Sequence, residues 1–361
     1  MRTNFSFTFR EFSGSLADLG TIIPYVVGVV TVSKMPITPI LLWFGIAYLA
    51  TGIYFKLPMP VQPMKVIGAI AISQSLTQRE IVSAGVLVGI FFLIISSTDI
   101  LEYLEKIIPK CVVRGIQLGL CLVIIIKGGE FILKDLEFGI LSGFFFGLCI
   151  FLKRDWLFVP IVLFFGIISG IYAHGIPNIA LTQIKITPVI PNSNEVISSF
   201  SVVLSQIPLT IMNSILAMSL LIKDFFKYEV EEKKLARSVG IMNLVSVPLG
   251  GLPMCHGAGG LAAHYRFGAR TGGSNIMIGL LFVAIAFFAT SELLSIISYG
   301  VLGTLLISAG FELGRHSLDT DSKFITFAIG IVSVLFSSVF IGLVVGLVLA
   351  YIKRDRGVFR S

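Results

Sequence analysis

Two short stretches gather the residues of this chain that could bind a charged ligand. They are Pro58-Met-Pro-Val-Gln-Pro-Met-Lys-Val-Ile-Gly-Ala-Ile-Ala71 and Cys255-His-Gly-Ala-Gly-Gly-Leu-Ala-Ala-His-Tyr-Arg266. In each stretch, proline or glycine interrupts the preceding segment, and we predict that a new helix begins after the interruption. The first N–H groups of a helix lack a backbone partner and carry the positive end of the helix dipole. Each stretch therefore predicts a helix start that favours an anion; close packing of two helices is the alternative role for the small residues.

Side chains beside these two starts suit the same chemistry. Three prolines within six residues prevent helix formation before Pro63, so we predict that Gln62 and Pro63 begin the first half-helix. Lys65 adds a full charge in its first turn, and Gln62 and His256 add neutral donors. The predicted binding residues come from four segments and are Gln62, Met64 and Lys65; His256, Gly257, Ala258 and Gly259; Asp18, Thr21 and Tyr25; and Gln206, Thr210 and Asn213.

Several of these residues have a second interpretation. Lys65 could reach a surface or form a structural ion pair with Asp18, and Asp18 could instead orient Lys65 or take up a proton. His256 could titrate near neutral pH or hydrogen-bond at a helix start. Gln206, Thr210 and Asn213 share one helical face, which could contact a ligand or hold neighbouring helices together.

Composition places this chemistry in a membrane. Hydrophobic residues make up 55% of the chain and charged residues only 13%, which excludes a water-soluble globule. Several apolar runs approach the ~20 residues that a helix needs to cross a bilayer. The four cysteines lack C-x-x-C spacing and the basic residues lie in loops between spans, so we expect no metal, no cofactor and no nucleic-acid partner. No G-x-S-x-G elbow supports a hydrolase, so we predict that the protein is not an enzyme.

Hydropathy predicts an all-α polytopic membrane protein with about fourteen spans. With the N-terminus inside, all but six of the 27 Lys and Arg residues fall on the cytoplasmic side. Only Lys34, Arg79, Lys127, Lys134 and Lys185 fall outside, and Lys65 lies at mid-depth. We therefore predict a multi-pass protein of the cell membrane with both termini in the cytoplasm and no cleaved signal peptide. The predicted spans are Glu11–Val30, Pro39–Phe55, Gln62–Ser75, Ile81–Ser97, Val112–Ile126, Phe138–Leu152, Trp156–Ala173, Ser201–Ile222, Leu235–Leu249, His256–Tyr265, Ser274–Ala289, Leu293–Glu312, and two within Phe324–Ile352.

An internal repeat relates the two halves. Leu57-Pro58-Met59 recurs as Leu252-Pro253-Met254, an offset of 195 residues, and the same offset carries Asp18 onto Asn213. Seven spans per half would insert the second half upside down, which is the inverted-repeat plan of secondary transporters. The two discontinuous half-helices would then meet near the middle of the bilayer.

Both stretches resemble the signature motifs of the molybdate transporter family, which is related to the sulfate permeases. The similarity extends over Pro60–Lys65 and Cys255–Gly272 and continues through the transmembrane region; His264 departs from the family pattern, which has glutamine there. The resemblance implies the 7+7 fold of the uracil and sulfate permeases and import of molybdate between the starts of the third and tenth segments. It also implies a core domain (1–110 and 201–290) and a gate domain (111–173 and 291–361), with an extracellular connector at 174–200.

Other functions of the same fold remain open at this stage. A transporter or passive channel for sulfate or another oxyanion would use the same site, and protons as coupling ion and a homodimer are open as well. A nucleobase permease holds its base with carboxylates on the eighth and tenth segments, whereas Ser201–Ile222 and His256–Tyr265 contain no Asp or Glu. The sequence therefore favours an oxyanion.

Overall fold

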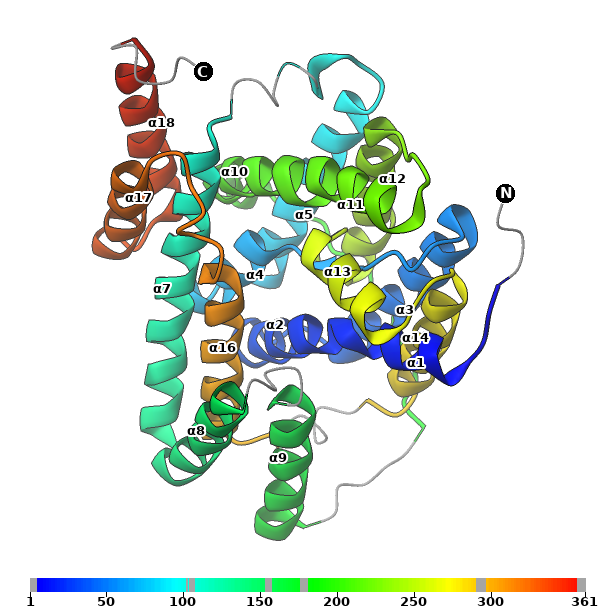
Figure 1. Ribbon diagram of the computed structural model, residues 1–361. Coiled ribbons are helices and arrows are strands. Elements are labelled where there is room, and N and C mark those ends of the chain that lie inside the picture. Colours follow the sequence, from blue (N-terminus) through cyan, green and yellow to red (C-terminus); the bar gives the residue numbers. More distant parts are fainter. Residues whose placement is uncertain are drawn as a thin grey trace.

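The computed structural model describes residues 5–101, 103, 108–152, 158–175, 181–289 and 297–355. These residues form helices joined by short connections, with one small pair of strands (Figure 1). The first half contains α1 (Phe9–Ser15), the 3-10 helix η1 (Leu16–Asp18), α2 (Leu19–Ser33), α3 (Ile37–Phe55), β1 (Gln62–Pro63), α4 (Lys65–Gln74), α5 (Gln78–Ile95), α7 (Lys110–Lys134), α8 (Leu136–Phe151) and α9 (Phe158–His174).

The second half repeats the pattern of a short helix preceded by a strand. It contains α10 (Ser193–Leu209), the π-helix η3 (Thr210–Leu216), α11 (Ala217–Phe226), α12 (Glu232–Ser246), the 3-10 helix η4 (Val247–Leu249), β2 (Met254–Cys255), α13 (Ala258–Phe267), α14 (Gly273–Ala286), α16 (Tyr299–Gly314), α17 (Lys323–Leu335) and α18 (Val339–Asp355).

The predicted spans correspond to helices, including the hairpin of α17 and α18 near the C-terminus. Five helical segments in the described chain are long and apolar enough to cross a membrane, and six shorter helices are also apolar. The exact number of fourteen spans stays a prediction. The first residues of the spans predicted at Trp156 and Leu293, and the basic residues Arg2, Lys106, Lys153, Arg154, Arg356 and Arg360, lie outside the described residues.

The helices pack in two groups. In the first, α3 contacts α14, α5 contacts α10 and α12, α2 contacts α4, and α1 contacts α13 and α14. In the second, α7 contacts α16, α17 and α18, while α8 contacts α9 and α16. Figure 1 shows the second group along the left and lower sides of the molecule. The groups meet where α2 contacts α16, α4 contacts α7, and α10 contacts α18 and α7, so the interrupted helix α4 lies at their boundary.

Glycines allow the closest helix crossings within each group. A Cβ at Gly128 would lie 2.6 Å from the Gly303 carbonyl oxygen, so α7 and α16 touch backbone to backbone. A Cβ at Gly45 would likewise lie 2.8 Å from the Gly279 carbonyl oxygen, where α3 meets α14. Small residues at such crossings are typical of helix packing in lipid. They make each group a closely packed unit.

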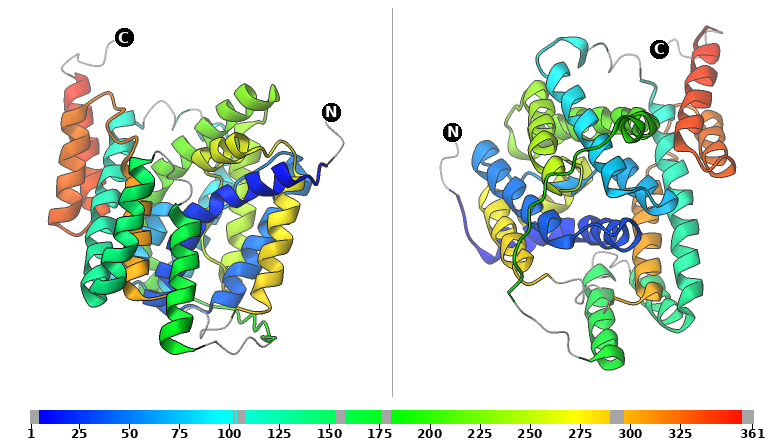
Figure 2. Two further views of the ribbon diagram at one scale, coloured as in Figure 1. Left: turned by 60° about the horizontal axis from the view of Figure 1, so that its bottom comes forward. Right: turned by 180° about the vertical axis from the view of Figure 1, so that it is seen from behind.

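Residues 181–192, which precede α10, run over the back of the first group, as the right view of Figure 2 shows. The Thr182 N–H donates to the Phe287 carbonyl and the Val189 N–H to the Pro248 carbonyl, which attach the segment to that group. The predicted connector is shorter than expected, because Asn192 caps α10 and the helix already begins at Ser193. Its position on the outer side of a membrane stays a prediction.

Candidate functional site

The two interrupted segments meet as a pair of antiparallel strands. Gln62 of β1 lies opposite Cys255 of β2, and Pro63 lies opposite Met254. The Met64 N–H donates to the Pro253 carbonyl at 2.8 Å and extends the pairing to the start of α4. The prediction that these segments come together is therefore confirmed. Figure 1 shows the helices that follow them, α4 and α13, near the middle of the molecule.

Two asparagines that the sequence analysis did not single out hold the repeated Leu-Pro-Met segments. Asn243 of α12 donates to the Met254 carbonyl at 2.7 Å and accepts from the Met254 N–H at 2.9 Å. Asn275 of α14 donates to the Met59 carbonyl at 2.6 Å. Met59 and Met254 are the residues that the offset of 195 relates. Both extended segments are therefore fixed by asparagines of the second half, Met254 from α12 and Met59 from α14.

Both half-helices begin later than predicted. Gln62 and Pro63 are extended, and α4 begins at Lys65 with Met64 as its N-cap residue. His256 precedes α13, which begins at Ala258 after Gly257. The prediction missed the strand pairing. Gln62 and Pro63 are extended because they pair with β2, and helix propensities contain no information on that partner.

Lys65 stands in the first turn of α4 and is half-buried. Within the described residues its ammonium has no hydrogen-bond acceptor and no carboxylate partner. The predicted alternative of an ion pair with Asp18 is wrong, because Asp18 is engaged with other groups. A half-buried cation that lacks a partner within the described chain is costly in an apolar segment, which is typical of a functional position.

Asp18 is the centre of a buried network behind the strand pair. Its carboxylate accepts from the Tyr48 hydroxyl and from the Gln62 Nε2, both at 2.6 Å, and lies 2.9 Å from the Nε2 atom of His264. The four side chains come from η1, α3, β1 and α13 and are all at most 2% exposed. Asp18 therefore joins four elements and does not face open space.

The network explains two of the motif glycines. Because Nε2 of Gln62 donates to Asp18, its Oε1 turns toward Gly257 and has no hydrogen-bond partner among the described residues. A Cβ at Gly257 would lie 2.1 Å from that oxygen, and a Cβ at Gly260 would lie 2.5 Å from the Asp18 Oδ1. A side chain at either position would overlap with the atoms of this network.

His256 is fully buried, with its imidazole held on both sides. Its Nδ1 lies 2.9 Å from the Pro60 carbonyl oxygen and its Nε2 lies 2.9 Å from the Ser238 hydroxyl, while Phe55 contacts its ring edge to face. These contacts tie the second interrupted segment to the first and to α12. The geometry matches the alternative of a hydrogen-bonding role at the helix start.

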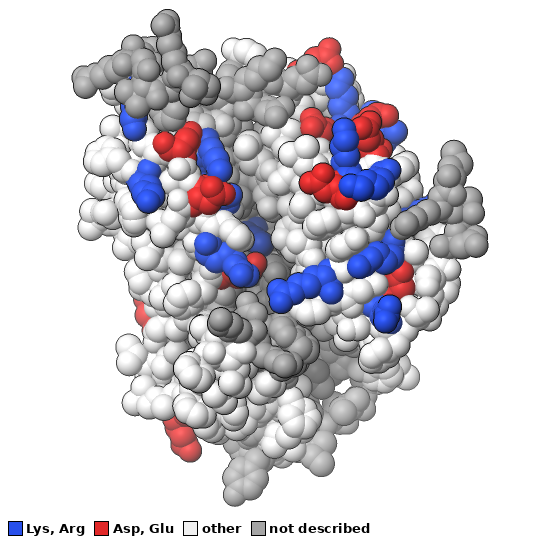
Figure 3. Space-filling view, in the orientation of Figure 1, with Lys and Arg blue, Asp and Glu red and all other residues white. Residues whose placement is uncertain are grey.

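The N-terminus of α13 is the open part of the site. No side chain caps this helix, and Gly259 in its first turn is exposed. A Cβ at Gly259 would meet no atom within 4 Å, in contrast with Gly257 and Gly260. Thr21 and Asn213 are half-buried, whereas Met64 and Ala258 are buried. Figure 3 shows a hollow between two groups of charged side chains on this face of the molecule.

Three of the remaining predicted residues are buried inside the protein. Gln206 accepts with its Oε1 from the Val66 and Ile67 N–H groups of α4, and its Nε2 donates to the Thr210 hydroxyl. Tyr25 packs on α4, where a Cβ at Gly68 would lie 2.7 Å from its ring. These side chains therefore support α4. The sequence alone could not distinguish this supporting role from direct contact with a ligand.

Comparison with known proteins identifies the family. The family described as "Molybdate transporter of MFS superfamily" matches residues 10–124 and 198–313, which include both interrupted segments. Molybdate transporter 2 of Arabidopsis thaliana is 33% identical, over 96% of this chain and 87% of that protein. This chain belongs to the molybdate transporter family.

The fold of this molybdate transporter family member is that of sulfate-permease-type anion transporters. The transmembrane domain of the cyanobacterial bicarbonate transporter BicA aligns with a TM-score of 0.68 at 16% identity, covering 93% of this chain and 96% of that one. Murine Slc26a9 in the inward-facing state aligns with a TM-score of 0.70 at 14% identity, covering 98% and 69%. Molybdate transporter 1 of Chlamydomonas reinhardtii is a further relative, 24% identical over 86% of this chain and 84% of that protein. The prediction of the fold class and of the family is confirmed.

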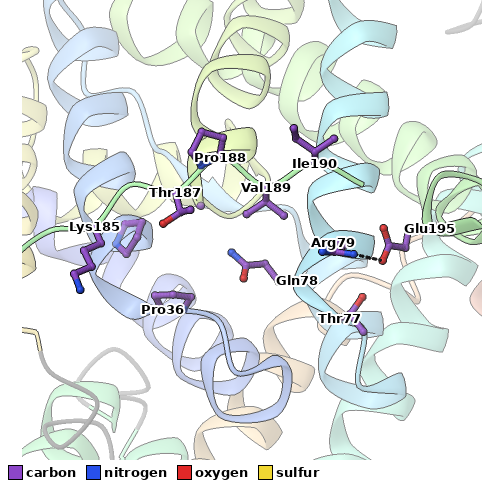
Figure 4. Close-up of a pocket in the computed structure, with 12 residues that line it drawn as sticks. Pro36, Thr77, Gln78, Arg79, Lys185, Thr187, Pro188, Val189, Ile190 and Glu195 are labelled. Carbon is purple, nitrogen blue, oxygen red and sulfur yellow. Dashed lines mark ion pairs between the residues drawn. The ribbon is translucent and has the colours of Figure 1, made fainter. Parts of the chain in front are cut away.

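The protein has a further pocket, which lies away from the strand pair. It encloses about 500 Å³ between the starts of α3 and α5 and the segment that precedes α10 (Figure 4). Arg79 lines it and forms an ion pair with Glu195 at 3.8 Å, and Lys185 lines it from the connecting segment. The pocket shares none of its lining residues with the predicted site.

Proposed function

We propose that this protein is a secondary transporter that moves molybdate across the cell membrane by alternating access. The proposal is carried by the Lys65 ammonium, which has no partner among the described residues, at the start of α4, together with the uncapped N-terminus of α13 beyond the opposite end of the strand pair. Relatives named as molybdate transporters support the choice of cargo. The anion would lie against Lys65 and the first N–H groups of α13, with Gly259, Thr21 and Asn213 around it.

The charges around this position favour an oxyanion. A helix N-terminus carries about half a positive charge, and Lys65 adds a full one. The Asp18 carboxylate behind the strand pair is already hydrogen-bonded to Tyr48 and Gln62 and lies close to His264. Four oxygen acceptors of a tetrahedral dianion would find N–H donors without meeting a free carboxylate.

Alternating access would come from relative movement of the two helix groups. The anion site lies within the group of α1–α5 and α10–α14, while α7 and α16 of the other group pack against α4 and α2. We propose that the first group is the core domain and the second the gate domain, with both termini in the cytoplasm. Protons are the proposed coupling ion, with the buried pair of Asp18 and His264 as the group that would carry them.

Transport by reconstituted protein tests the proposal. Liposomes containing the protein should accumulate molybdate against its gradient, and tungstate and sulfate added as competitors should rank the cargo. If the protein carries sulfate better than molybdate, it is an oxyanion transporter of another specificity. If molybdate moves only down its concentration gradient, the result supports a passive channel.

Lys65→Ala should lower molybdate affinity by roughly tenfold or more, because a hydrogen bond to a charged group contributes about 1.5–3 kcal/mol. Isothermal titration of the purified protein measures this effect. Lys127→Ala is the matched control: Lys127 is a partly buried lysine of α7 that is paired with Glu130 and lies away from the strand pair. Equal affinities of wild type and Lys65→Ala would refute the site.

A further inference from the structure

Gln206 caps the half-helix α4 from a different helix. Its Oε1 accepts from the Val66 N–H at 2.9 Å and from the Ile67 N–H at 3.3 Å. Because two backbone donors face that end of the side chain, it must carry the oxygen, and Nε2 then donates to the Thr210 hydroxyl at 2.7 Å. Gln206 is 1% exposed, so water does not compete for these bonds.

This contact makes the two helix starts unequal. The neutral oxygen of Gln206 already occupies the first free N–H groups of α4, whereas no side chain caps α13. An anion at the start of α4 could use the Val66 and Ile67 N–H groups only by displacing Gln206. With Gln206 in place, a carboxamide of fixed position lies at the start of α4, next to the residue that follows Lys65.

Irregular backbone holds Gln206 in this position. Pro208 removes a backbone donor from the last turn of α10, and the π-helix η3 begins at Thr210. The bond from Gln206 to Thr210 spans this junction. A π-helix is energetically unfavourable and is frequently found at functional sites. Here it places a polar side chain at the start of α4, where a regular helix would continue its apolar packing.

We infer that Gln206 is a specificity-determining residue, which keeps the anion off the N-terminus of α4 and thereby fixes the size of the site. The inference rests on the proposed function. With the carboxamide present, an oxyanion must fit between it, Lys65 and the start of α13, and anions of different radius fit unequally. Without the carboxamide, two further N–H donors and extra room become available to any oxyanion.

The experiment measures binding of molybdate and of sulfate, separately, by isothermal titration of the purified full chain in lipid nanodiscs. The variants are Gln206→Ala, Gln206→Glu and Lys65→Ala. The matched control is Asn192→Ala, which removes the side-chain cap at the other end of α10, far along the helix from Thr210. Thermal unfolding of each variant checks that it is folded.

We expect Gln206→Ala to reduce the preference for molybdate over sulfate by about fivefold or more, and Asn192→Ala to leave that ratio unchanged. Gln206→Glu retains an acceptor for α4 but adds a negative charge, so it should weaken binding of both anions by roughly tenfold, the effect of about 1.4 kcal/mol. Loss of stability alone would lower both affinities without changing their ratio.

The outcomes separate this inference from the proposed function. If wild type binds neither anion, the proposed function fails. If Lys65→Ala loses binding but Gln206→Ala keeps the wild-type ratio, or Gln206→Glu keeps wild-type affinity, only the role of Gln206 is overturned. If Gln206→Ala does not fold, the result for Gln206→Glu decides, because that variant preserves the cap.

Discussion

Asp18 illustrates how a residue can be found by its chemistry and still be given the wrong contacts. A carboxylate within an apolar span indicates function, and the sequence could not show whether it faces Lys65 or lies behind it. In the structure Asp18 holds Gln62, Tyr48 and His264, and so fixes the orientation of the Gln62 amide next to Gly257. His264, which departs from the family pattern, belongs to this same network. Asp18 thus connects His264 of α13 with Gln62 of β1.

Two neighbouring glycines provide a test at this scale, because one is confined and the other is open. Gly257→Ala would place a Cβ 2.1 Å from the Gln62 Oε1, so we expect a destabilisation of about 1–3 kcal/mol, as overpacking typically costs. Gly259→Leu points into open space, so the protein should keep its stability and lose molybdate binding. Thermal unfolding and titration calorimetry on both variants measure these effects. A Gly259→Leu variant that binds normally would place the anion elsewhere.

Among the elements, the half-helices show what hydropathy and proline spacing can predict. Pro58, Pro60 and Pro63 correctly indicate a break before α4, and the glycines indicate one before α13. The strand pair between them is not visible in either segment, since each extended stretch gains its partner only when the two halves meet. For the same reason the starts were predicted two or three residues early. The cap from Gln206 was also hidden, because nothing in α4 itself indicates which helix supplies the acceptor.

The asparagines that hold the two strands should contribute comparably to stability. Asn243→Ala removes both bonds to Met254 and leaves buried backbone groups unpaired, which costs about 1–3 kcal/mol. Asn275→Ala removes the bond to the Met59 carbonyl and should fall in the same range. Denaturation in detergent, with the exposed Asn194→Ala as a reference, measures both. If one of the two variants is as stable as wild type, the two asparagines do not contribute equally to the free energy of unfolding.

For the whole molecule, the packing of the helices into two groups suggests what moves. Within the described chain the second group is closely packed through Gly128 and Gly303, and it touches the first group at α2, α4 and α10. The sequence repeat located both interrupted segments, but it could not show which helices pack with which. Helix partners depend on side-chain shape across the contact, and a long apolar run has many similar faces.

Cross-linking tests whether the two groups move relative to each other. Gly28 of α2 approaches Leu306 of α16, since a Cβ at Gly28 would lie 3.3 Å from the Leu306 side chain. In a background without other reactive cysteines, Gly28→Cys with Leu306→Cys joined by a short thiol cross-linker should reduce molybdate uptake to background. Cleaving a reducible linker should restore it.

The control joins two helices of the same group. A Cβ at Gly314 of α16 would lie 2.6 Å from the Sγ atom of Cys121 on α7, so Gly314→Cys can be linked to that native cysteine. This link should leave uptake largely intact, because α7 and α16 would move together. Binding must be measured alongside uptake: a link from Gly28 to Leu306 that blocks uptake but preserves molybdate affinity traps one state of the transport cycle. If the protein with Gly28 linked to Leu306 retains full uptake, α2 and α16 do not need to move relative to each other. Transport would then depend on the movement of other helices.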